Sequence, residues 1–249
     1  MIIHAEELEA IIHLYEFRGF FTELLQLLES GLGLERAHMG MFTELAILYS
    51  KHKADSLMEH LRLFWQRINI PKVIRACEAA HLWAQLVFLY TKYDEFDNAA
   101  LTIMANSSVA WEHTSFKEVV VKVSNLEIYY KALRFYLEEQ PLMINDLLAG
   151  LSPRIDHTRA VQLFQKTNNL PLVKPYLIAV QSSNNSAVNS AYNELLIEEE
   201  DFKSLRDSID NFPNFDHLAH AQRLEKHALL EFRRIGAHLY KVNNNFSLY

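Results

Sequence analysis

The sequence has little cysteine, glycine or proline. Its 249 residues include one cysteine, six glycines and six prolines. The single Cys77 cannot form a disulfide within the chain, and its place among apolar residues at helical spacing predicts a small buried hydrophobe in a reducing compartment. All-β sandwiches and barrels need many more turn residues, so this shortage favours long helices joined by short connections.

Basic clusters and long apolar runs are also missing. Lys and Arg never exceed two in a row, and the formal net charge is −7. This balance speaks against a nucleic-acid-binding domain and against an electrostatic membrane anchor. No apolar stretch approaches the ~20 residues that span a bilayer. The first residues lack the basic and apolar segments of a secretion signal.

The usual signatures of enzymes are missing too. The sequence contains no glycine-rich phosphate loop, no G-x-S-x-G elbow and no His-Glu-x-x-His pair. Cys77 would need a histidine and an orienting partner from elsewhere in the chain to act as a nucleophile. We therefore expect no catalytic residue, no cofactor and no enzyme activity.

Two groups of residues raise the question of a metal site. His217 and His220 are spaced i, i+3 and could share one helix face, but no spacing supplies the third ligand that a catalytic zinc requires. The acidic run from Glu198 to Asp201 lacks the alternating ligands and central glycine of a calcium loop. We interpret the histidines as surface residues and the acidic run as a solvated helix end, and we expect no metal ligands.

Aromatic residues and helical periodicity, in contrast, are abundant. The chain has 15 Phe, 11 Tyr and 3 Trp, and large aromatic side chains supply much of the buried area in helical arrays. Apolar residues recur at i, i+3, i+4 and i+7, which is one face of an amphipathic helix. Two early examples are Leu8, Ile11, Ile12 and Tyr15, and Phe42, Leu45, Ala46 and Tyr49.

One pattern returns along the chain. A Leu-Tyr pair closes a helical run, a short polar gap follows, and an aromatic or apolar residue opens the next run. Self-similar helical hairpins of this kind predict a solenoid, in which each hairpin buries its apolar face against its neighbours. The four occurrences are Leu14-Tyr15 with Phe20, Leu48-Tyr49 with Leu57, Leu89-Tyr90 with Phe96, and Leu239-Tyr240 with Phe246.

Four aromatic residues lie close together in the sequence, around the third of these Leu-Tyr pairs. Because these side chains recur at helical spacing, we interpret them as core between helices rather than as a binding groove. The residues are Phe88, Tyr90, Tyr93 and Phe96.

Several helix ends can be predicted from local signals. Ser56 with Glu59, and Ser115 with Glu118, have the spacing of capping boxes, so the β-branched run after Ser115 is predicted to be helical. Ser152 before Pro153, and Asn69 before Pro71, predict helix starts. Gly31 and Gly33 are predicted C-caps, and the turn around Pro153 is a predicted repeat boundary.

Some longer stretches go beyond a generic helical pattern. They occupy residues 32–46, 69–76, 93–99, 151–161 and 221–227. In this order they resemble the clathrin heavy-chain family, in the proximal part of its leg, and the resemblance extends from about His4 to Tyr240.

The resemblance implies an all-α, right-handed superhelix of short helical hairpins. Residues 1–147 would form one clathrin heavy-chain repeat and 148–249 the first part of the next. It also implies a structural segment of a vesicle coat, with neighbouring heavy-chain legs and the clathrin light chain as partners. The segment would act in endocytosis and vesicle transport at the cytoplasmic face of coated pits and coated vesicles, and it would associate with membrane only through the coat.

The family's light-chain face includes a basic residue that matches Lys51. A second lysine of the family falls where this chain has Gln140, which would remove one partner for an acidic light chain. The loss of one exposed ion pair is worth only ~0–1 kcal/mol. Without the family, Lys51 would be interpreted as an ordinary exposed lysine.

An alternative hypothesis is a free-standing helical-repeat adaptor that regulates coats. It predicts a capped, polar C-terminal end, whereas a cut leg segment would be unstable after about Pro213. The family's N-terminal propeller and its trimerisation helices have no counterpart in this sequence, so the resemblance implies a leg fragment, a truncated gene product or a partial gene model. The run Asn243 to Asn245 is expected to fray.

Overall fold

A computed structural model of the chain describes residues 5–33 and 39–243. Within these residues it contains seventeen α-helices, four short 3-10 helices and no β-strand. The predicted all-α class is therefore confirmed. Phe246 and the end of the predicted frayed tail lie outside the described residues.

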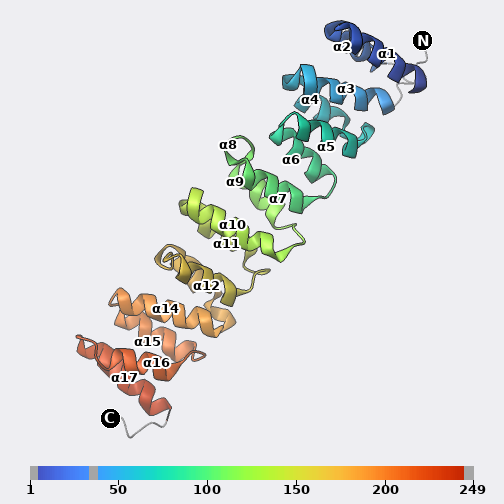
Figure 1. Cartoon of the computed structure of the whole chain (residues 1–249). Helices are drawn as coiled ribbons and strands as arrows, with labels where there is room; N and C mark the ends of the chain where they lie inside the picture. The colour runs from blue at the N-terminus through green and yellow to red at the C-terminus, as the bar shows by residue number, and fades with distance from the viewer. Residues whose placement is uncertain (1–4, 34–38, 244–249) are drawn as a thin grey trace. The chain divides into compact units, whose positions relative to one another are not determined.

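The α-helices succeed one another with short connections (Figure 1). They are α1 (Ala5–Arg18), α2 (Phe21–Gly31), α3 (Met39–His52), α4 (Ala54–Phe64), α5 (Ile70–Ala79), α6 (Trp83–Lys92), α7 (Phe96–Ala105), α8 (Ser107–Ala110), α9 (His113–Val120), α10 (Leu126–Glu139), α11 (Ile144–Leu151), α12 (His157–Lys166), α13 (Lys174–Val180), α14 (Ser186–Glu198), α15 (Phe202–Asn211), α16 (His217–Leu224) and α17 (Leu230–Val242). The 3-10 helices are η1 (Trp65–Arg67), η2 (Pro141–Met143), η3 (Pro171–Val173) and η4 (Gln181–Ser183).

The chain forms two compact units, residues 1–128 and 129–249, whose border falls within α10. In the first unit each helix packs against the next helix or the next but one. Thus α3 contacts α4 and α5, α5 contacts α6, α6 contacts α7, and α7 contacts α9. This nearest-neighbour packing is that of a helical-repeat stack.

The second unit follows the same rule. The helix pairs α12 and α14, α13 and α14, α14 and α15, and α16 and α17 are in contact, and α15 also contacts α17. The predicted arrangement of stacked hairpins is therefore confirmed within each unit.

Large aromatic side chains form the interior of both units, as the composition predicted. Phe42 and Phe116 are fully buried in the first unit, and Tyr136, Phe164 and Phe232 are fully buried in the second. Each replaces a large area of water contact by side-chain contact, which is the main favourable contribution to folding.

The Leu-Tyr pairs lie where the pattern predicted them. Each tyrosine is two or three residues before the end of its helix: Tyr15 in α1, Tyr49 in α3, Tyr90 in α6 and Tyr240 in α17. The pattern therefore marks the last turn of helices within the stack.

Three predicted helix starts are wrong. Ser56 and Ser115 lie inside α4 and α9, which begin two residues earlier than each serine. The N-cap of α9 is Glu112, whose carboxylate accepts the backbone N–H groups of Thr114 and Ser115. Hydrogen bonds from Ser115 and Thr114 lower the pKa of Glu112 to about 2. The helical assignment of the β-branched run is nevertheless confirmed, because Val119 and Val120 belong to α9.

The third error is at Ser152 and Pro153, which form the turn after α11 rather than the start of a helix. The next helix, α12, is capped by Asp156, whose carboxylate accepts the N–H groups of Thr158 and Arg159. Asn69 does cap α5 as predicted, since its side chain accepts the N–H of Lys72.

The predicted glycine C-caps are also wrong. Gly31 is the last residue of α2 and is buried, and the C-cap Leu32 has ordinary right-handed backbone angles. A β-carbon at Gly31 would collide with the terminal methyl group of Met41. A larger residue at this position would require the flexible end of the Met41 side chain to move.

Candidate partner-binding surface

Lys51, which matches the basic residue of the family's light-chain face, lies in the last turn of α3. Its side chain is 50% exposed, and its Nζ lies 3.0 Å from Oε1 of Glu16 in α1. A basic side chain in this position also interacts favourably with the C-terminal end of the helix dipole. An acidic partner that bound Lys51 would compete with Glu16.

A second set of charged side chains lies close by in the chain. The Tyr49 hydroxyl donates to Oε1 of Glu29 at 2.6 Å, and Lys53 Nζ lies 3.4 Å from the same oxygen. These contacts, led by the tyrosine hydrogen bond, lower the pKa of Glu29. The C-terminal part of α3 is thus tied to α1 by the Lys51–Glu16 ion pair and to α2 by the Tyr49–Glu29 hydrogen bond, and Lys53, directly after α3, adds an ion pair with Glu29.

Gln140 lies at the corner between α10 and η2, where it is half-buried. Its backbone N–H donates to the carbonyl oxygen of Tyr136 at 2.9 Å. Leu142, two residues later, is 92% exposed. Lys51 belongs to the first unit and Gln140 to the second.

Three tyrosine–glutamate hydrogen bonds were not predicted from the sequence. In addition to Tyr49 and Glu29, Tyr90 donates to Glu78 at 2.8 Å and Tyr240 donates to Glu225 at 2.8 Å. In each pair the glutamate lies at the C-terminal end of the preceding helix. Burial, followed by these hydrogen bonds, raises the pKa of the tyrosines. The signal available in the sequence was a glutamate 12 to 20 residues before the tyrosine of a Leu-Tyr pair.

The two histidines with possible metal spacing make backbone contacts. Nε2 of His217 lies 2.6 Å from the carbonyl oxygen of Pro213, and Nδ1 of His220 lies 2.9 Å from that of Asp216. In residues 5–33 and 39–243 no group of three or more His, Cys, Asp or Glu could hold a metal ion. His220 is buried, so its interpretation as a surface residue was wrong.

Cys77 and the acidic run agree with their predicted roles. Cys77 is fully buried, and burial raises the pKa of its thiol to about 12, so a reactive thiolate is strongly disfavoured. Asp201, the last residue of the acidic run, caps α15 by accepting the N–H of Ser204. Hydrogen bonds from Ser204 lower the pKa of Asp201.

The aromatic stripe of α6 and α7 is only partly core. Tyr90 is buried, but Tyr93 is 48% exposed. Phe88 and Phe96 line a groove of about 360 Å³ that also includes Lys92 and Lys122. The ammonium groups of Lys92 and Lys122 lie over the rings of Phe88 and Phe96, at 5.6 and 5.1 Å from the ring centroids. The sequence predicted core for all four residues, but Phe88 and Phe96 line this groove.

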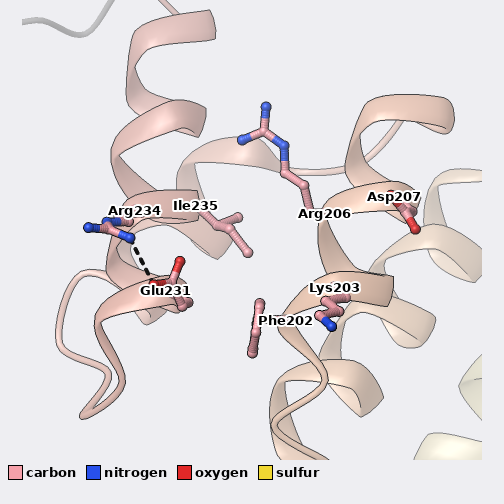
Figure 2. A pocket seen from close by; sticks show the side chains of 7 residues that line it. All are labelled: Phe202, Lys203, Arg206, Asp207, Glu231, Arg234 and Ile235. Carbon is pink, nitrogen blue, oxygen red and sulfur yellow. Dashed lines mark hydrogen bonds and ion pairs between the residues drawn. The ribbon is translucent and has the colours of Figure 1, made fainter.

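A larger groove, of about 500 Å³, lies between α15 and α17 (Figure 2). Phe202 and Ile235 provide its apolar part. Arg234 donates to Glu231 at 2.8 Å across one turn of α17. The groove therefore presents apolar surface beside charges that are already partly compensated.

In the residues that the structure describes, helical hairpins, polar contacts between neighbouring helices and open grooves define a helical-repeat protein. In the part of the chain that the structure describes, no helix has the length and apolar character needed to cross a membrane. The model of the family Clathrin, described as "Region in Clathrin and VPS", matches residues 1–143 and 148–248.

Curated relatives extend this match over nearly the whole chain. The clathrin heavy chain of Drosophila melanogaster is 62% identical over 246 residues, which are 99% of this chain and 15% of the relative. Clathrin heavy chain 2 of Homo sapiens is 61% identical over 244 residues, 98% of this chain and 15% of the relative. The clathrin heavy chain of Dictyostelium discoideum is 61% identical over 247 residues, 99% of this chain and 15% of the relative.

The chain therefore belongs to the clathrin heavy-chain family. It spans about 15% of the length of these curated relatives.

Proposed function

We propose that the chain acts as a structural segment of a vesicle coat and performs no catalysis. The observation that carries this proposal is the identity of 61–62% with clathrin heavy chains of an insect, a mammal and an amoeba over 98–99% of the chain. The same match favours a coat segment over a free-standing adaptor. Because the chain spans about 15% of these relatives, the role proposed is that of one part of a longer leg.

In this proposal residues 1–147 form one clathrin heavy-chain repeat and residues 148–249 the first part of the next, in a right-handed superhelix. The division of the family match into residues 1–143 and 148–248 supports these boundaries. Each hairpin buries apolar surface against its neighbours, so a leg built this way resists bending. A coat lattice requires stiff legs and contacts between neighbouring heavy-chain legs.

The proposed place of action is the cytoplasmic face of coated pits and coated vesicles, in endocytosis and intracellular transport. Contact with membrane is indirect, through other components of the coat. The net charge of −7 and the mixed charges of the described surface support this, because a polybasic lipid-binding cluster is not part of the sequence.

The proposed light-chain contact is Lys51. Since Lys51 is already paired with Glu16, two substitutions test the contact in opposite directions. Lys51→Met removes the charge and keeps most of the apolar stem, so it should weaken binding of a purified clathrin light chain. Glu16→Gln releases Lys51 from its competitor, so it should strengthen binding. Each change should be at most about fivefold, as expected for one exposed ion pair.

Isothermal titration calorimetry of the light chain against the three proteins measures both effects. If Lys51→Met and Glu16→Gln left the affinity unchanged, Lys51 would serve only to tie α3 to α1, and the proposed contact would be withdrawn.

The same titration tests Gln140. Gln140→Lys restores the family's lysine and should strengthen light-chain binding by up to about fivefold. Gln165→Lys, at an exposed position of α12, is the matched control for the added charge. Equal strengthening by both substitutions would indicate a general effect of net charge and would exclude a specific contact at residue 140.

A further inference from the structure

Four buried polar side chains gather on α14 and on the segments beside it. Gln181 lies in η4, Asn189 and Asn193 lie in α14, and Ser208 lies in α15. Each is at most 5% exposed, in a unit whose other buried side chains are mostly apolar. We call these four residues the polar seam. All of them belong to the second unit.

Hydrogen bonds join three members of the polar seam. The side-chain nitrogen of Gln181 donates to the hydroxyl of Ser208 at 2.6 Å. That hydroxyl donates to Oδ1 of Asn193, also at 2.6 Å. The series ends there, because Nδ2 of Asn193 has no hydrogen-bond partner among the residues that the structure describes. Ser208 therefore connects η4 with α14 through a single hydroxyl group.

Asn189, one turn before Asn193 on α14, is satisfied on one side only. Its Nδ2 donates to Oδ1 of Asn184 at 2.8 Å and to the carbonyl oxygen of Asn214 at 3.1 Å. Its Oδ1 has no hydrogen-bond partner within residues 5–33 and 39–243. α14 thus buries one unpartnered acceptor and one unpartnered donor on successive turns. Such atoms cost free energy in the folded state, and contact with water recovers it.

A polar pocket of about 250 Å³ opens beside the polar seam. Gln181 and Ser208 line it together with Asp207 and Asn211, so water in this pocket is next to the Gln181–Ser208 hydrogen bond. Asn193 lies one hydrogen bond behind Ser208. Water therefore reaches the unpartnered nitrogen of Asn193 as soon as α14 and α15 separate slightly.

Both connections of α14 contain a residue with left-handed backbone angles. Asn184, before the helix, has φ of 50°, and Glu200, after it, has φ of 57°. Asparagine tolerates this region, but for glutamate it is strained because of the β-carbon. Hinges are short connecting positions that absorb a change of backbone angles. Movement of α14 relieves the strain at Glu200.

Two ion pairs oppose this movement at the C-terminal end of α14. Glu199 pairs with Lys174 of α13, and Glu198 pairs with Arg223 of α16 at 3.3 Å. The side chains of both pairs are partly or largely exposed, and exposed pairs contribute little stability. The ion pairs therefore do not offset the unpartnered atoms of the polar seam.

We propose that the polar seam makes the α14–α15 hairpin open before the helices on either side of it. Opening gives water to the unpartnered atoms of Asn189 and Asn193 and replaces the hydrogen bonds of Ser208, so it costs less than separating an apolar contact. Asn145 and His220 each bury one unpartnered atom, whereas α14 buries two. The opening is a property of the fold alone. Only its use, as a point where a leg bends, rests on the proposed function.

Hydrogen exchange of the full chain, measured by mass spectrometry in increasing urea at pH 7, tests the proposal. Amides of α14 and α15 should exchange through a local opening that depends weakly on urea. Amides of α12 and α17 should exchange more slowly, through a larger opening that urea accelerates. Opening from the chain end gives the other order, in which α17 exchanges at least as fast as α14.

The triple variant Gln181→Met/Asn193→Leu/Ser208→Ala replaces both partners of each hydrogen bond by apolar groups of similar size. It should slow the exchange of α14 and α15 by about tenfold, since the unpartnered nitrogen of Asn193 is removed. The control Gln165→Met/Ser182→Ala makes similar changes at exposed positions of the same unit and should alter exchange by about twofold at most.

Two single variants act in opposite directions. Ser208→Ala leaves Gln181 and Asn193 without their shared partner, so it should speed the exchange of α14 and α15 by about tenfold. Glu200→Gly removes the strain of the left-handed position in the closed state, so it should slow exchange by about threefold.

The proposal would be overturned if α14 and α15 exchanged only together with α12, or if α17 exchanged as fast as α14. Equal effects of the triple variant and its control would overturn it as well. Far-ultraviolet circular dichroism verifies that the triple variant is folded. If it is not, Ser208→Ala decides the matter, because unchanged or slower exchange in that variant would exclude the polar seam as the cause of opening.

Discussion

At the scale of single residues, several side chains have two roles in one position. Tyr90 buries its ring in the first unit while its hydroxyl reaches Glu78 at the end of the preceding helix. Lys51 lies half-exposed and is paired with Glu16, 35 residues earlier in the chain. The sequence predicted the burial of Tyr90 from its spacing. It could not predict the partner of Lys51, because that contact depends on how α1 packs beside α3.

Tyr90→Ala should lower the free energy of unfolding by about 3 kcal/mol, since it removes a large buried ring. Tyr90→Phe keeps the ring and loses only the hydrogen bond to Glu78, so its cost should be about 1 kcal/mol. Urea unfolding at pH 7 measures both values. Tyr93→Ala, at a residue that is 48% exposed, is the control and should cost less than about 0.5 kcal/mol. An unchanged unfolding midpoint for Tyr90→Ala would contradict the core assignment.

His60 should make stability depend on pH. It is buried among aromatic rings, with Nε2 2.9 Å from the carbonyl oxygen of Phe42, and burial lowers its pKa. Between that lowered pKa and the ordinary value of about 6.5, the unfolded chain binds more protons than the folded chain. The stabilisation is therefore complete above about pH 6.5 and declines as the pH falls, by at most about 1.4 kcal/mol per pH unit.

Urea midpoints between pH 5 and pH 8 measure this effect. Other histidines with lowered pKa values, His157 and His238, contribute to the same trend. The quantity to compare is thus the difference in slope between the native chain and His60→Gln, in which the slope should be shallower. Parallel pH profiles for the two proteins would exclude His60 as a contributor.

At the scale of helices, periodicity predicted the elements but local motifs did not predict their ends. Ser56 and Ser115 have the serine–glutamate spacing of a capping box, yet both lie within helices. A cap requires an extended residue whose side chain faces free N–H groups, and spacing alone does not specify where the preceding turn leaves the chain extended. At α9 that residue is Glu112, which few helices use.

Asp156, the observed N-cap of α12, can be compared directly with Ser152, which the sequence predicted as a cap. Asp156→Ala removes the side chain that accepts the N–H groups of Thr158 and Arg159, so it should cost about 1 kcal/mol of stability. Ser152→Ala, at the site that the sequence wrongly predicted as a cap, should cost less than about 0.5 kcal/mol. Thermal or urea unfolding of the two variants measures the difference. Equal costs would contradict the assignment of Asp156 as the cap.

At the scale of the whole molecule, the chain forms two compact units, each a stack of helices with buried apolar side chains. The sequence predicted stacked hairpins throughout, because the same apolar spacing recurs along the chain. It did not predict the grooves, since these depend on which helices face one another. In a stack held together by nearest neighbours, the loss of one contact is felt mainly by the adjacent helices.

Phe232→Ala should therefore destabilise the second unit locally. Phe232 is fully buried in α17 and its ring packs edge-on against Phe202 of α15, so its truncation should cost about 3–5 kcal/mol. Hydrogen exchange should accelerate in α15 to α17 and stay unchanged in α3 to α6. Phe42→Ala, which empties the first core, should give the opposite distribution. Uniform acceleration along the chain in either variant would show that the units unfold together.

The tyrosine–glutamate hydrogen bonds also have a consequence for the order of events during synthesis. Glu78 and Tyr90 are 12 residues apart, and Glu225 and Tyr240 are 15 residues apart. A ribosome adds such a segment in roughly one to three seconds, whereas a loop of this size closes in well under a millisecond. A hairpin that has such a hydrogen bond can therefore join its two helices before the next hairpin has emerged. The hairpin that follows one of these three then meets a neighbour whose two helices are already joined.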